Sequence, residues 1–468
     1  MAGAWSRGRR SAGSRAGRLL TLSETERDLI RLANEPGAAR WLEQIRATGG
    51  CEQPVHLAGH STVVDAATGE VLRSFDTADE GGRLAVRCRT RRSVRCESCA
   101  RQHQGDTYHL VRAGLAGGKG IRSEVVEHPR LMVTLTAPSF GRVHRSGRCH
   151  SLRPGVCRHG APMGCGRFHR DTAAVVGAPL CAACYDYPGH VLWHAHLGEL
   201  WSRTMRNVRR LLAAAGGVPR SRLSEHLTVS FAKVAEYQRR GAVHVHAVVR
   251  LDGPEGAGTS PPAWATETVL AAAVRTAAGA TRVATPYAPE VGERTVVWGR
   301  QLDIHPIGDQ DRFTTPVRDD AVAAYIAKYT TKSATEGGTD YPVRSLADVR
   351  ARRVPEHVRA LMRACWRLGG LPELAHLRLR GWAHMLGFRG HVLTKSRGYS
   401  TTYKELRAAR AAWQGGGRVD GTVVDSAWRY VGRGWTPGEA ELARGVAFDA
   451  AAGRALAREA VGWVERGG

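Results

Sequence analysis

The sequence contains no long apolar run. No stretch reaches the roughly 18 consecutive apolar residues that span a bilayer, and the first 20 residues, MAGAWSRGRRSAGSRAGRLL, lack the sustained apolar segment of a secretory signal. We therefore expect a cytoplasmic protein without a membrane-spanning segment. The GxxxxGK[ST] pattern of a phosphate-binding P-loop is also missing, so ATP-driven work would need a separate protein.

Acidic residues are scarce relative to basic ones. The chain has 68 Lys and Arg against 43 Asp and Glu, a formal net charge of +25. Such a surface attracts polyanions, and nucleic acid is the first candidate partner. The alternative is a solvated basic surface in which a high-GC genome has raised the arginine content.

The length of 468 residues allows two or three domains. A segment rich in Cys and His and punctuated by Gly and Pro, at about 144–190, is expected to bind zinc. The expected division is a flexible basic N-terminal region (1–80), a main domain (81–335), basic helical segments (336–400) and an Ala/Arg-rich helical C-terminal region (401–468). Gly, Ala, Pro and Thr dominate 252–290, which is expected to be a linker.

Eight of the ten cysteines lie between Cys88 and Cys184. In a reducing compartment such a cluster favours a metal site over disulfides. Cys96-x-x-Cys99 and Cys181-x-x-Cys184 have the spacing of a tetrahedral zinc site, and we expect one structural Zn²⁺ held by these four residues. Cys51 and Cys365 stand apart and are expected to be structural. A looser set offers a possible second site: Cys149, Cys157, His159, Cys165 and His169.

Two β-prone runs, 227–237 and 242–251, predict a hairpin. His244 and His246 alternate with apolar residues on the second strand, so both imidazoles lie on one face with Cβ atoms roughly 7 Å apart. If Gly241 supplies the positive φ of a three-residue loop, the register places Glu236 opposite His244. Two imidazoles and a carboxylate suit Mg²⁺ or Mn²⁺ during phosphate chemistry. The alternative is an exposed pair of strand histidines.

The stretch 318–332 predicts a helix, with acidic residues at its start and Lys332 at its end. Tyr325 and Tyr329 fall on one face with Val322 and Ile326. This spacing is also that of an ordinary buried stripe. Lys328, one turn from Tyr325, is placed to lower the pKa of a nucleophilic phenol.

These residues resemble the HUH endonucleases, and within them the actinobacterial rolling-circle replication initiators. Three short motifs match in family order: TLT (134–136), HVHAVV (244–249) and VAAYIAK (322–328). The wider match runs from about Cys88 to Tyr403. It includes LTAPSFGRVH (135–144), LCAACYDY (180–187), KVAEYQRRGAVHVH (233–246), YIAKYTTKS (325–333) and GHVLTKSRGYSTT (390–402).

The resemblance implies an α+β fold in which 81–335 is an HUH endonuclease domain. Its palm-like core would be a central antiparallel sheet flanked by helices, with the cysteine-rich, zinc-binding segment inserted at about 144–190. His244 and His246 would be the paired ligands of a catalytic divalent ion, Glu236 the third ligand and Tyr325 the nucleophile. Lys328 takes the place of the family's assisting lysine, and Tyr329 is either a second nucleophile or a packing residue. Attack of Tyr325 on origin DNA, single-stranded or cruciform, would leave a 5′-phosphotyrosyl end and a free 3′-hydroxyl. A host helicase and polymerase would complete replication.

Basic and aromatic residues near the predicted site suggest contacts to DNA. The candidates are Arg239, Arg240, Lys332, Lys395, Arg397 and Tyr399. Two other functions remain open: a conjugative relaxase or single-strand transposase, and a zinc-stabilised DNA-binding regulator that does not nick. Relaxases carry their tyrosine before the histidine motif, whereas Tyr325 follows it, which favours an initiator.

Overall fold

The structure is a computed structural model that describes residues 22–79, 81–151, 155–308, 318–331, 341–413 and 421–464. The chain forms two compact units, one of residues 1–102 with 417–468 and one of residues 103–416. The boundary falls inside helix α4 (Glu97–Ala116). Within the described residues, no helix combines the length and the apolar composition needed to cross a bilayer.

The first unit is built from both ends of the described chain. Its antiparallel sheet has the order β13-β1-β2, with β3 also paired to β1. The pairing of β1 with β13 runs from Val55 opposite Arg433 to Asp65 opposite Thr422. The elements are α2 (Glu24–Asn34), α3 (Ala38–Ala47), β1 (Val55–Asp65), β2 (Val71–Asp76), β3 (Leu84–Val86), β13 (Thr422–Arg433) and α11 (Pro437–Val464).

This unit differs from the sequence-based expectation at both ends. Residues 22–79, expected within a flexible region, form two helices and two strands, because α2 and α3 contact α11 and β1 pairs with β13, segments far along the chain. The region 401–468, expected to be helical, contains the twelve-residue strand β13. The first 21 residues of the expected N-terminal region lie outside the described part of the chain.

The second unit contains a five-stranded antiparallel sheet with the order β11-β4-β8-β7-β12. An antiparallel sheet flanked by helices was expected and is confirmed. The strands are β4 (Arg130–Leu135), β7 (Thr228–Tyr237), β8 (Val243–Asp252), β11 (Leu302–Pro306) and β12 (Leu393–Lys395). Two short hairpins lie outside it: β5 (Gly147–Arg148) with β6 (Phe168–His169), and β9 (Val283–Ala284) with β10 (Thr295–Val296).

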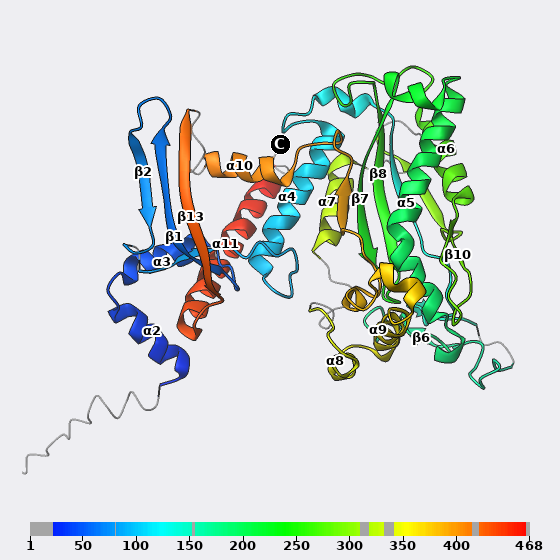
Figure 1. Cartoon of the computed structure of the whole chain (residues 1–468), viewed down its shortest axis with the longest axis horizontal. Helices are drawn as coiled ribbons and strands as arrows, with labels where there is room; N and C mark the ends of the chain where they lie inside the picture. The colour runs from blue at the N-terminus through cyan, green and yellow to red at the C-terminus, as the bar shows by residue number, and fades with distance from the viewer. Residues whose placement is uncertain are drawn as a thin grey trace, which may run out of the picture. The chain divides into compact units, whose positions relative to one another are not determined.

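Helices cover both faces of this sheet (Figure 1). Side chains of α5 (Tyr187–Ala215) and α6 (Glu267–Ala280) share a core with the face that carries Val243, Val245 and Ala247. Side chains of α4 and of α7 (Asp319–Thr330) pack on the opposite face. The expected linker 252–290 therefore contains a helix, α6, which begins at the side-chain cap of Thr266.

The remaining helical elements surround this core. They are η1 (Ser123–Glu127), η2 (Ala182–Cys184), η3 (Arg220–Glu225), α8 (Leu346–Ala351), α9 (Glu356–Leu368), η4 (Pro372–Leu377), η5 (Ala383–Met385) and α10 (Tyr403–Trp413). Helix α9 packs on α5 through a second apolar cluster that includes the fully buried Cys365.

Candidate active site

His246 lies at the centre of a polar group on the face of the sheet covered by α7. Its Nε2 lies 2.9 Å from Glu236 Oε2 and 3.4 Å from the hydroxyl oxygen of Tyr325. Its Nδ1 lies 3.0 Å from Thr134 Oγ1. Two strands, β4 and β7, and the helix α7 thus place polar side chains around one imidazole. His246 itself is buried, with 3% of its surface exposed.

The β7–β8 hairpin has the predicted geometry. Glu236 is paired with His244, Gly241 has φ +76°, and the Gln238 amide donates to the Ala242 carbonyl across a three-residue loop. The ring centroids of His244 and His246 are 6.0 Å apart. Burial, assisted by the neighbouring charges of His246 and Arg240, lowers the pKa of His244 to about 4. His244 is therefore neutral near pH 7 and has a ring nitrogen available as a ligand.

These side chains bring nitrogen and oxygen donors together. Two imidazoles and a carboxylate lie on one sheet face without a thiolate, and His246 contacts Glu236 directly. A donor set of this kind can hold a divalent cation, although His244, His246 and Glu236 are not among the described groups whose ligand atoms all lie within 4.8 Å of one another. The contact from Thr134 to Nδ1 of His246 directs Nε2 towards Glu236. Outer hydrogen bonds of this kind orient metal-binding histidines.

Tyr325 and Tyr329 both reach His246 from α7. The Tyr325 ring lies edge-on to the imidazole with centroids 5.0 Å apart, and the Tyr329 ring stacks on it at 5.6 Å. The two phenol rings are 4.8 Å from each other. Burial, and next a hydrogen bond with Tyr329, raise the pKa of Tyr325 above its ordinary value. The phenol is thus protonated at neutral pH.

The helix that carries these tyrosines matches its prediction, since α7 spans Asp319–Thr330. Its buried stripe consists of Val322, Ala323, Ile326, Ala327 and Thr330, whereas Tyr325 is 39% exposed. The ammonium of Lys328 lies over the Tyr329 ring, 5.8 Å from its centroid. The contact of Lys328 is therefore with the second tyrosine of the pair.

The candidate DNA contacts differ in burial and in hydrogen bonding. Tyr399 is fully buried and its hydroxyl donates to the Val111 carbonyl, so its expected stacking on bases is wrong. Lys395 donates to three carbonyls, among them that of Ser400 at 2.8 Å, and Arg240 donates to the carbonyls of residues 137 and 138. The side chains of Lys395 and Arg240 thus form hydrogen bonds to backbone carbonyls within the unit.

Two of the remaining candidates face solvent. The side chains of Arg239 and Arg397 are exposed. Lys332 lies outside the described residues.

Two residues near the site were not identified from the sequence. Thr134 was recognised only as part of a strand motif, yet it is paired with His246 across β4 and β8. Asp303 on β11 is paired with Thr134 in turn and acts electrostatically on His244. The signal for both is the strand register, which the local sequence does not contain.

Among the described residues, nine of the ten cysteines and three histidines form three groups of four potential metal ligands, each with its ligand atoms within 4.8 Å of one another. The groups are Cys51, Cys88, Cys96 and Cys99; His144, Cys149, Cys165 and His169; and Cys157, His159, Cys181 and Cys184. The expectation that the two CxxC pairs share one zinc ion is wrong, because each pair completes a different group. The looser second set is divided between two groups, and Cys51, expected to stand apart, is a member of the first.

The first group lies entirely within the first unit. Cys51 Sγ is 3.9 Å from Cys96 Sγ and 3.6 Å from Cys99 Sγ, far beyond the length of a disulfide bond. Hydrogen bonds from Cys51 and Cys88 lower the pKa of Cys96 to about 6, and that of Cys99 is also lowered. Hydrogen bonds with neighbouring cysteines raise the pKa of Cys51 and Cys88. Cys96 and Cys99 therefore favour the thiolate, the form that binds metal, whereas Cys51 and Cys88 favour the thiol until an ion displaces their protons.

Comparisons with known proteins agree along nearly the whole chain. The family model described as replication initiator protein, pSAM2, matches residues 37–448. A replication initiator protein of Streptomyces ambofaciens is 46% identical over 455 residues, which cover 93% of this chain and 95% of the relative. No solved structure matches. The chain therefore belongs to the pSAM2-type family of replication initiator proteins.

Proposed function

We propose that this initiator is a site-specific single-strand DNA endonuclease and strand transferase of the HUH type. It nicks one strand at the replication origin and rejoins strands at termination. The observation that carries the proposal is the position of the Tyr325 hydroxyl, 3.4 Å from His246 Nε2, which in turn lies 2.9 Å from the Glu236 carboxylate. A phenol beside a nitrogen and oxygen ligand set suits phosphoryl transfer to tyrosine.

His244, His246 and Glu236 would hold a catalytic Mg²⁺ or Mn²⁺. When bound, the cation supplies positive charge that polarises the scissile phosphate. The neutral state of His244 and the fixed orientation of His246 prepare the site for such an ion.

Tyr325 is the nucleophile in this proposal. Its oxygen forms a bond to phosphorus while the bond from phosphorus to the 3′ oxygen breaks; the phenol gives up its proton and the departing 3′ oxygen takes one up. The products are a 5′-phosphotyrosyl strand and a free 3′-hydroxyl. Because the phosphotyrosyl bond retains the energy of the original phosphodiester, a 3′-hydroxyl can attack it and reseal a strand.

Tyr329 is proposed as the second nucleophile that closes the displaced circle. Its ring lies 4.8 Å from that of Tyr325 and stacks on the same histidine, an arrangement that would let both phenols attack at one phosphate position. Lys328, over the Tyr329 ring, would then assist this second step. Arg239 and Arg397 are the exposed candidates for contacts to single-stranded or cruciform origin DNA, and a host helicase and polymerase would act after the nick.

The test is incubation of the full chain with labelled single-stranded DNA from the replicon that encodes it, in Mn²⁺, followed by denaturing electrophoresis. Wild type and Tyr329→Phe should give a labelled protein band, because Tyr325 remains; Tyr325→Phe should give none. The two tyrosines lie one turn apart on α7, so each variant is the matched control for the other.

An adduct that survives in Tyr325→Phe and disappears in Tyr329→Phe would assign the first attack to Tyr329. Tight DNA binding without an adduct in any of the three proteins would contradict the endonuclease proposal and favour a regulator.

A further inference from the structure

The segment between β4 and α5 contains eight of the potential metal ligands in an alternating order. Along the chain they occur as four pairs. The first and third pairs belong to one group and the second and fourth pairs to the other. The pairs are His144 with Cys149, Cys157 with His159, Cys165 with His169, and Cys181 with Cys184. Each group therefore encloses part of the other in sequence.

The distances within both groups are close to those around a tetrahedral zinc ion, two of the four being slightly shorter. Bond lengths to sulfur and nitrogen place ligand atoms about 3.4–3.8 Å apart around one ion. In the group of His144, Cys149, Cys165 and His169, Cys149 Sγ is 3.8 Å from His144 Nδ1, and Cys165 Sγ is 3.3 Å from His169 Nε2.

The group of Cys157, His159, Cys181 and Cys184 has similar distances between its ligand atoms. His159 Nδ1 lies 3.1 Å from Cys184 Sγ and 3.8 Å from Cys181 Sγ. Mixed thiolate and imidazole sets of four are those of structural zinc sites.

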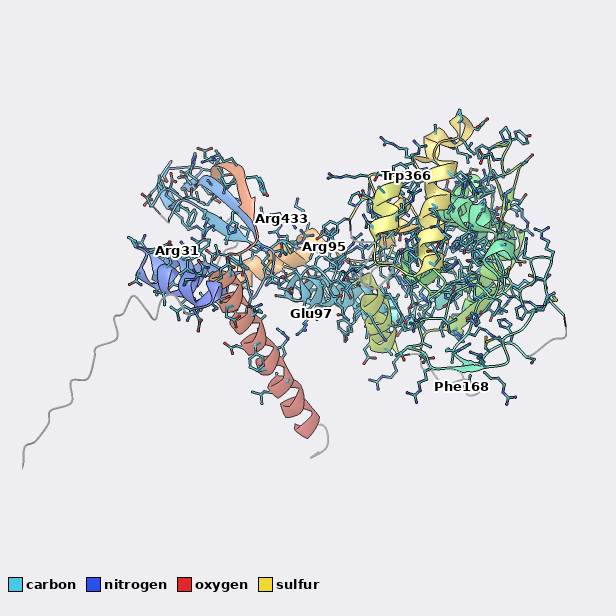
Figure 2. The ribbon with its side chains drawn as sticks, turned by 90° about the horizontal axis from the view of Figure 1, so that it is seen from below. Arg31, Arg95, Glu97, Phe168, Trp366 and Arg433 are labelled. Carbon is cyan, nitrogen blue, oxygen red and sulfur yellow. The ribbon has the colours of Figure 1, made fainter. Side chains whose placement is uncertain are left out.

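This segment lacks an apolar core of its own. Among its described residues, 144–151 and 155–184, the buried positions are Cys149 and two glycines. Three of its larger apolar side chains are exposed, among them Phe168 at 74% and Val156 at 61% (Figure 2 labels Phe168 on β6). Val175, Val176 and Leu180 are only partly buried. A segment of this size with so little buried apolar surface needs another source of stability, and structural metal is a common one.

The backbone brings the paired ligands together. The β5–β6 hairpin pairs Gly147 with His169, and the Cys149 amide donates to the Arg167 carbonyl, which joins the first and third ligand pairs. The turn at the second pair is closed by the Cys157 amide and the Ala161 carbonyl.

We propose that residues 144–184 form a module held together by two interleaved zinc ions, one in each group. The two sites depend on each other because their ligands alternate along the chain. Cys157 and His159 lie in sequence between ligands of one site, and Cys165 and His169 lie between ligands of the other. With the four-cysteine group of the other unit, the chain carries three zinc ions.

The module also supports the β7–β8 hairpin. Gly177 has φ +90°, and a Cβ there would lie 2.5 Å from the carbonyl carbon and oxygen of Arg239, so the module backbone rests directly on the hairpin loop. Arg240 in the same loop donates to the carbonyls of Ala137 and Pro138, just before the module. Zinc binding is therefore expected to slow hydrogen exchange in this loop as well.

The test is the zinc content of the full chain, measured by inductively coupled plasma and native mass spectrometry. Wild type should carry three equivalents. Cys149→Ser and Cys184→Ser, one in each interleaved site, should each retain about one, because loss of either ion releases the other. Cys96→Ser, in the separate group, should lose one only. His150→Ala is the control within the module: its Nδ1 lies 3.4 Å from Cys149 Sγ, but it is outside both groups, so its content should stay at three.

A content that stays at three in Cys149→Ser and Cys184→Ser, or a wild type that binds one zinc or none, would overturn the proposal. Hydrogen exchange of the wild-type chain, with and without a chelator, avoids variants that fail to fold. Chelation should speed exchange across 144–184 and the hairpin loop while the interior of β4 and β8 stays protected; unchanged exchange in 144–184 would also overturn the proposal. None of these measurements depends on nicking.

Discussion

Replacing Thr134 by valine should weaken binding of the catalytic cation without removing a ligand. Thr134 Oγ1 lies 3.0 Å from His246 Nδ1. When His246 binds through Nε2, its Nδ1 carries the proton and donates to the threonine oxygen, which fixes both the tautomer and the ring angle. Valine has nearly the same shape and favours a strand, so β4 should keep its place.

The expected magnitude follows from this single hydrogen bond. Loss of an outer hydrogen bond to a metal-binding histidine typically reduces metal affinity about 10- to 100-fold, which corresponds to about 1.4–2.8 kcal/mol. The assay is formation of the covalent DNA adduct as a function of Mn²⁺ concentration. The half-maximal Mn²⁺ concentration should rise by that factor, while the rate at saturating Mn²⁺ should approach that of wild type.

Thr136→Val is the matched control. Thr136 lies two residues along, is buried, and its hydroxyl donates to the Gln301 carbonyl at 2.8 Å. This variant also loses one threonine hydrogen bond but no contact to His246, so its half-maximal Mn²⁺ concentration should not change. An unchanged requirement in Thr134→Val, or an equal increase in both variants, would refute the reasoning.

Two further predictions concern buried charges. Burial lowers the pKa of Lys233 from its ordinary 10.5 to about 8, so the cost of burying the ammonium is fully present below pH 8 and disappears as the pH rises to about 10.5. The free energy of unfolding of wild type should therefore gain about 3 kcal/mol over this range relative to Lys233→Met, as measured by urea denaturation at several pH values; parallel pH curves would contradict this. Asp319→Asn should destabilise the protein by about 1–3 kcal/mol, because the buried Arg130 guanidinium, 2.9 Å from Asp319 Oδ1, would lose its counter-charge. Urea denaturation tests this too, and stability equal to wild type at both low and high salt would show that the pair contributes nothing.

The sequence was sufficient where structure depends on neighbouring residues. The hairpin loop, the positive φ of Gly241 and the pairing of Glu236 with His244 all follow from eleven consecutive positions, 236–246. The helix with Tyr325 and Tyr329 follows from its periodicity in the same way.

Pairings between distant segments could not be predicted. The strand β13 pairs with β1, more than 350 positions earlier in the sequence, and no local pattern names that partner. The same limit explains why the grouping of the potential metal ligands was predicted wrongly. Two CxxC pairs with correct spacing can share one ion or belong to separate groups, and the local sequence does not distinguish the two. Tyr399 was misjudged because basic neighbours in the sequence suggested exposure, whereas its ring lies in the core beside Arg250.

The position of the proposed nucleophile depends on apolar packing as much as on the polar group around His246. Val322 and Ile326, on the buried stripe of α7, share one cluster with Val234 of β7 and Val248 of β8. These strand residues lie two positions from Glu236 and His246 and point to the same face of the sheet. The packing that seats α7 therefore also sets the distance from the Tyr325 hydroxyl to His246. Since phosphoryl transfer is sensitive to displacements of about 1 Å, the buried apolar residues beneath the helix are part of the proposed catalytic geometry.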